Sequence, residues 1–147
     1  MAAFNKFHSF VEDLAHKKHN LSSDVLKIYL TNTAPNASTH TAYDGVTGTT
    51  GPAEIAAGNG YTLTGATAAF TSSAQTSGTY KLTLQDPPTW TATGGTIGPL
   101  RYAVLYNSTS TGKELIGWWD YGASVTLQAT ETVVVDLDQT NGVLTIA

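Results

Sequence analysis

Two histidines and a glutamate near the start of the chain have a spacing that could create a metal site. His8, Glu12 and His16 follow one another at intervals of four residues, so a helix would place them on one face. Two imidazoles on either side of a carboxylate could hold an ion such as Zn²⁺. The pattern is not the His-Glu-x-x-His of metalloproteases, and the same residues suit the wet face of an amphipathic helix. We therefore expect neither a metal nor another cofactor.

Three aspartates in the second half could supply the paired carboxylates of a glycosidase. Asp136 and Asp138 stand two apart in a strand-like stretch, so they share the face opposite to its apolar residues, while Asp120 lies in an earlier strand. A solvated strand face explains them without catalysis. The chain has no cysteine, no Gly-x-Ser-x-Gly elbow and no Walker loop. We expect the protein not to be an enzyme.

The adjacent tryptophans Trp118 and Trp119 suggest a contact surface. Neighbouring residues of a strand point to opposite faces of the sheet, so only one of the two can fill a core between sheets. The other exposes apolar surface unless a loop, a second subunit or a sugar covers it. We interpret the pair as contact residues and keep stacking on a ligand as the alternative.

Residues 4–18 have the pattern of a helix. Phe4, Phe7, Val11 and Leu14 recur at spacings of three and four, which predicts one apolar stripe along a helix. A helix of this length is marginal on its own, so the stripe needs a surface to pack on, either the chain's own sheets or an adjoining subunit. We predict that residues 1–23 form a helical arm that makes contacts with a neighbour.

From about Asp24 onward the period changes to two, which is typical of strands with one buried face. Residues 31–60 are rich in Thr, Gly, Pro and Asn and read as a long loop. Asn141-Gly142 suits a hairpin turn between the last two strands. We predict a β-domain over residues 24–147, an antiparallel sandwich of jelly-roll type, with an immunoglobulin-like topology as the alternative. The other expected strands are residues 61–70, 79–84, 89–93, 101–106, 115–121, 125–127, 132–137 and 143–146.

The charge of the chain restricts its partners. The formal net charge is −4 at pH 7, with seven Lys and Arg in 147 residues. A nucleic-acid-binding domain neutralises phosphates with clustered basic residues, so we expect no nucleic-acid partner. No apolar run approaches the roughly 20 residues of a membrane span, and we expect no membrane contact. Residues 4–14 carry charges that a signal peptide lacks, so we expect a protein made and used without export.

Seven short blocks, spread over nearly the whole chain, carry a further signal. They are Phe4–Phe7, Phe10–Ala15, His19–Leu21, Leu30–Pro35, Glu54–Tyr61, Arg101–Asn107 and Leu115–Gly122. As a set, these blocks resemble small virion proteins of tailed bacteriophages, and the chain is most similar to the jelly-roll cement, or decoration, proteins that bind the outside of a capsid shell.

The resemblance implies a structural protein that binds the exterior of a phage capsid and stabilises it. Its implied partners are the major capsid protein and its own copies in a homotrimer, and it implies assembly in the bacterial cytoplasm and no catalytic residues. An acidic surface fits the outside of a shell better than the inside, where packaged DNA would repel it. A tail or fibre module, or a carbohydrate-binding sandwich, is the alternative. The expected contacts with shell or subunit are Phe4, Phe7, Val11, Leu14, Trp118 and Trp119.

Overall fold

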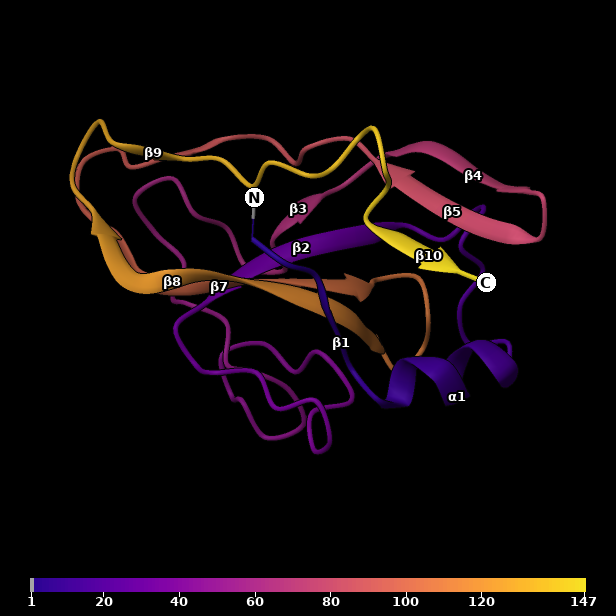
Figure 1. Ribbon diagram of the computed structural model, residues 1–147. Helices are drawn as coiled ribbons and strands as arrows, with labels where there is room; N and C mark the ends of the chain where they lie inside the picture. Colours follow the sequence, from indigo (N-terminus) through magenta and orange to yellow (C-terminus); the bar gives the residue numbers. More distant parts are fainter. Residues whose placement is uncertain (1) are drawn as a thin grey trace.

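The strands of the chain pair into three antiparallel sheets, which the computed structural model describes over residues 2–147 (Figure 1). In chain order the elements are β1 (Asn5–Lys6), α1 (Ser9–Ala15), β2 (Leu26–Thr31), β3 (Ala66–Thr67), β4 (Phe70–Thr76), β5 (Thr79–Leu84), β6 (Trp90–Thr91), β7 (Ile97–Asn107), β8 (Leu115–Leu127), β9 (Thr132–Val133) and β10 (Leu144–Ile146). The sheets have the orders β1-β8-β7-β2-β3, β10-β5-β4 and β6-β9. The prediction of an all-β antiparallel sandwich is confirmed. The jelly roll stays a prediction.

The long strands β7 and β8 form the centre of the five-stranded sheet. They pair from Ile97 opposite Leu127 to Tyr106 opposite Leu115. Alternation along β7 sends Leu105 into the core between the sheets and sends Val104 and Tyr106 to the other face. This is the alternation that the sequence predicts for residues 101–106.

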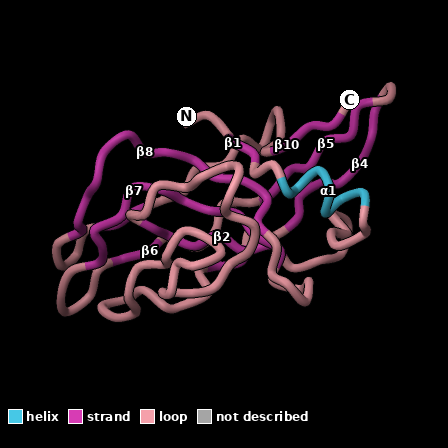
Figure 2. Tube along the Cα trace, turned by 90° about the horizontal axis from the view of Figure 1, so that it is seen from below, coloured by secondary structure: helices cyan, strands magenta, loops and turns pink. Residues whose placement is uncertain are grey.

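Both faces of the five-stranded sheet are covered. The two smaller sheets lie over one face and enclose the main core with it. Most of the loop of residues 32–60 lies over the other face, below the sheet in Figure 1 and in front of it in Figure 2. Its end returns to the main-core side, where Ile55 is buried in that core and Asn59 accepts a hydrogen bond from the Thr93 N–H after β6. Under this loop the rings of Tyr43 and Tyr106 stack 4.6 Å apart, and Tyr29 meets Tyr43 edge-on at 5.1 Å. The long loop that the sequence predicts is therefore a covering layer with its own apolar cluster.

The predicted helix over residues 4–18 is wrong in extent. The helix α1 spans only Ser9–Ala15, and the residues before it are extended, with Asn5 paired to Trp118 and Lys6 to Gly117 of β8. Residues three apart in an extended segment point to opposite faces, so Phe4 and Phe7 do not share a stripe.

The four apolar side chains of the predicted stripe consequently differ in burial and do not form one apolar face. Phe7 and Phe10 are buried, Leu14 is partly buried, and Val11 is 54% exposed. The segment that the sequence predicts to be an arm thus packs on the chain's own sheet, which is the intramolecular arrangement left open above.

The expected hairpin around Asn141-Gly142 is also wrong. β10 pairs with β5, and β9 pairs with β6, so the two segments that flank the dipeptide belong to different sheets. The Asp138 carboxylate closes the turn instead, because it accepts hydrogen bonds from the backbone N–H groups of Thr140 and Asn141 at 2.9 and 2.7 Å. Gly142 has φ +86°, as the dipeptide predicts, but the turn leads into a different partner strand.

Candidate functional site

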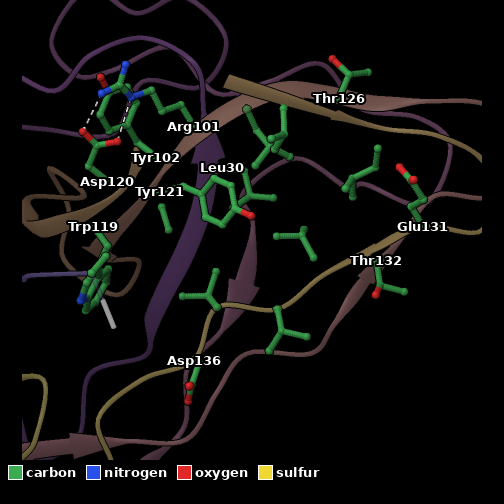
Figure 3. A pocket seen from close by; sticks show the side chains of 18 residues that line it. Leu30, Arg101, Tyr102, Trp119, Asp120, Tyr121, Thr126, Glu131, Thr132 and Asp136 are labelled. Carbon is green, nitrogen blue, oxygen red and sulfur yellow. Dashed lines mark hydrogen bonds and ion pairs between the residues drawn. The ribbon is translucent and has the colours of Figure 1, made fainter. Parts of the chain in front are cut away.

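A cleft of about 850 Å³ opens at the side of the sandwich, between β7, β8 and the segment of residues 131–136 (Figure 3). It exists because β8 is 13 residues long but pairs with β1 over only two of them. Past that pairing, no described strand joins the outer edge of β8. The apolar wall of the cleft comprises Leu30, Leu100, Val125, Leu127, Val133 and Val135.

Tyr121 projects into the middle of this cleft (Figure 3). Its side chain is 70% exposed, more than any other large apolar side chain in residues 2–147. The next residue, Gly122, has φ +96°, which favours glycine, and the pairing of β7 with β8 shifts in register between Leu100 and Tyr102. The irregular backbone at this point lets the Tyr121 side chain project into the mouth of the cleft.

An ion pair fixes one side of the cleft. Arg101 donates to both carboxylate oxygens of Asp120, at 2.8 and 2.9 Å, and its guanidinium lies 5.2 Å from the centre of the Tyr102 ring. Asp120 also accepts the Gly122 N–H at 2.7 Å. The hydrogen bond from Arg101, and then that from Gly122, hold the pKa of Asp120 below its usual value. Asp120 is therefore committed to positioning Arg101 and the turn after Tyr121.

The opposite edge of the cleft carries Thr126, Glu131, Thr132 and Asp136 (Figure 3). Thr126, Thr132 and Asp136 alternate with the inward-facing Val125, Val133 and Val135, so their polar groups turn toward solvent. One oxygen of Glu131 accepts the Gln128 N–H at 2.8 Å. The cleft thus combines an exposed aromatic ring, an aliphatic wall and the Glu131 carboxylate at its edge, which is the composition of a binding site.

The two tryptophans do point to opposite faces, as the sequence predicts. Trp119 is buried in the main core, lines the cleft, and lies 5.3 Å from the ring of Phe4. Trp118 lies on the other face, where Phe7 covers it with the ring centres 4.5 Å apart. The N-terminal segment therefore covers both indoles. Of the six residues predicted as contacts, Val11 is the one whose side chain is mostly exposed.

The candidate metal ligands do not come together. Glu12 lies 3.8 Å from His16, whereas His8 is 3.3 Å from the Ser38 hydroxyl of the covering loop. Among residues 2–147 no group of three His, Cys, Asp or Glu side chains has the geometry to hold a metal ion. The third histidine of this region, His19, is buried against Asn107, and burial lowers its pKa.

A buried carboxylate, which the sequence analysis does not single out, holds the covering loop on the sheet. Glu54 is 4% exposed and accepts hydrogen bonds from the hydroxyls of Tyr43 and Tyr61, at 2.6 and 2.7 Å, and from the Thr64 N–H at 3.1 Å. Burial and the charge of Glu54 raise the pKa of both tyrosines. The only sequence signal is an acidic residue between apolar ones in a loop otherwise poor in charge.

No protein-family model, curated protein or solved structure matches this chain. Within the described residues, no helix has the length and apolar character needed to cross a membrane.

Proposed function

We propose that this protein is a structural component of a phage virion, a cement protein that binds the outside of the capsid shell as a homotrimer. The observation that carries the proposal is the edge strand β4. It is seven residues long, pairs with β5 alone, and contains neither a charged residue nor a proline. Proteins that work as monomers protect such edges with lysines, prolines or bulges. The register of β4 against β5 shifts between Phe70 and Ser72, but from Ser72 to Thr76 the edge is regular and has none of these devices. This regular, uncharged part of the edge indicates that another chain covers it.

The surface around β4 supports a permanent contact. Thr71, Ser72, Ala74, Gln75 and Thr76 are all exposed, so a neighbouring chain can reach this strand. Their small or uncharged side chains cost little to desolvate compared with lysine or glutamate. A partner strand would gain the unused backbone hydrogen bonds of the edge. We assign this edge to contact with a second copy or with the major capsid protein.

The charge supports the outer side of the shell. The net charge of −4 opposes contact with packaged DNA, and charged residues make up only 12% of the chain. Few charges on the surface leave a large neutral area for subunit contacts. The resemblance to phage decoration proteins supports the same role, and no catalytic residue is part of the proposal.

The proposal is tested with a charge placed on the edge. Shells of the encoding phage that lack this protein are incubated with the wild type, with Ala74→Lys and with Ala129→Lys. Ala129 is an exposed alanine in the turn after β8, so its variant is a matched control. Sedimentation of the shells measures the bound protein. We expect saturating binding of the wild type and Ala129→Lys and loss of binding by Ala74→Lys. Failure of the wild type to bind shells, with the protein folded by circular dichroism, would refute the cement function.

A further inference from the structure

We propose that the cleft around Tyr121 binds a neutral saccharide. This inference does not depend on the capsid function, because no residue of β4 lines the cleft. The cleft volume of about 850 Å³ falls within the usual range of ligand sites, roughly 300–1,000 Å³.

The exposed aromatic ring in the cleft suits a sugar. Tyr121 is 70% exposed and stands between aliphatic side chains rather than under a loop (Figure 3). An aromatic face that stays open to solvent beside an apolar wall is costly unless a ligand covers it. The flat face of a pyranose ring, with its C–H groups, suits such a ring, and the Tyr121 hydroxyl remains free to bond with the sugar.

Two polar groups beside the ring can bond with a sugar. One carboxylate oxygen of Glu131, which lines the cleft, accepts the Gln128 N–H, and within the described chain its other oxygen has no hydrogen-bond partner. Sugar hydroxyls donate hydrogen bonds to carboxylates. Glu131 and the Tyr121 hydroxyl therefore offer acceptors to a polyol on the ring.

The charges around the cleft disfavour an anionic ligand. Asp120, Glu131 and Asp136 lie around it, and Arg101 is the one basic residue among the described residues that line it. Arg101 donates two hydrogen bonds to the Asp120 carboxylate, which neutralises the charge of its guanidinium. A phosphate, a nucleic acid or a sialylated glycan would meet a negative site.

The backbone beside Tyr121 favours a sugar over an added peptide strand. Gly122 has a positive φ and gives its N–H to Asp120, so the edge of β8 is bent and one of its donors is already used. The register also shifts at this part of the β7–β8 ladder. An inserted strand needs a regular row of free N–H and C=O groups, which this edge does not present.

The experiment measures saccharide binding by the full chain. Cellotriose, maltotriose and triacetylchitotriose serve as neutral probes, and sialyllactose serves as the anionic comparison. Trp119 lines the cleft, so intrinsic fluorescence reports binding, and calorimetry gives the affinity. We expect at least one neutral probe to bind and sialyllactose not to bind.

Three variants test the assignment. Tyr121→Ala should weaken binding about tenfold or more, and Tyr121→Phe should retain most of it because the ring remains. Leu63→Ala removes an exposed apolar side chain outside the cleft and is the control. Circular dichroism checks that each variant is folded.

The proposal fails under any of three results. One is that neither these probes nor a broad array of neutral glycans binds. The second is that a bound sugar is unaffected by Tyr121→Ala. The third is that Tyr121→Ala abolishes association between copies while no sugar binds, which would assign the cleft to a protein strand. None of these results bears on binding of the protein to shells through β4.

Discussion

Glu54 is a buried carboxylate whose partners are tyrosines rather than a basic residue. Its two hydroxyl donors come from the covering loop and from the chain just after it, and Thr31 of β2 pairs with its backbone. Hydrogen bonds to a charged group are stronger than those between neutral groups. This single side chain therefore holds the loop of residues 32–60 to the sheet more firmly than the Thr- and Gly-rich sequence alone would.

Removing the carboxylate tests this role. Glu54→Ala should lower the free energy of unfolding by about 2–5 kcal/mol, because it leaves two buried hydroxyls without an acceptor. Urea denaturation measures the change. Glu12→Ala, at an exposed position on α1, should stay within about 0.5 kcal/mol of the wild type. Equal effects of the two substitutions would contradict a structural role for Glu54.

The same tyrosine cluster predicts loss of stability at alkaline pH. Burial, and then the charge of Glu54, raise the pKa of Tyr106 to about 12, whereas an unfolded tyrosine titrates near about 10. A raised pKa in the folded state stabilises the fold at pH values below about 10, and this contribution is lost as the pH rises toward 12.

For Tyr106 alone the loss should reach about 2 kcal/mol by pH 12. Burial raises the pKa of Tyr29 and Tyr61 as well, so the decline of the wild type should be steep. Denaturation at a series of pH values between about 9 and 12 measures the slope, and Tyr106→Phe should show a shallower one. Identical slopes for the two proteins would show that Tyr106 does not titrate with unfolding.

At the scale of elements, the N-terminal segment is part of the sheet and not an appendage. β1 lies along β8, and its flanking phenylalanines cover both tryptophans, Phe4 over Trp119 and Phe7 over Trp118. The short helix α1 then buries Phe10 in the main core. The segment thus closes the five-stranded sheet on both of its faces.

Two substitutions distinguish this arrangement from an apolar stripe on a helix. Phe7→Ala should destabilise the protein by about 3–5 kcal/mol, because Phe7 is 0% exposed and its ring packs on Trp118. Val11→Ala should change the stability by less than about 0.5 kcal/mol, since Val11 is 54% exposed. Thermal melting measures both. A stripe on one helix would make the two losses similar.

The sequence predicts an element correctly where neighbouring residues determine its structure, and incorrectly where a contact with a distant strand determines it. β5 spans the predicted residues 79–84 because alternation and the prolines after Asp86 are local. A spacing of three between Phe4 and Phe7 fits a helix as well as the two faces of an extended segment, and only the distant β8 decides between them. The exposed aromatic of the cleft is Tyr121 rather than a tryptophan, because the bend at Gly122 depends on the register of β7.

At the scale of the whole molecule, the open edge of β4 predicts self-association. The purified wild type should form a trimer at tens of micromolar by light scattering, because a low-charge surface with an unprotected edge favours contact between copies. Ala74→Lys should shift the protein toward the monomer, and Ala129→Lys should not. A wild type that stays monomeric in solution and on particles would contradict the trimer.

The pairing of β1 with β8 also determines when, during synthesis, the five-stranded sheet can finish folding. Asn5 meets Trp118 across a sequence separation of 113 residues, so β1 is synthesised long before the strand with which it pairs. Closing so long a loop is entropically costly, and chains with many distant contacts fold slowly. Until β8 emerges from the ribosome, the sheet that Phe4, Phe7 and Phe10 cover is incomplete, and the nascent chain carries three uncovered aromatic rings.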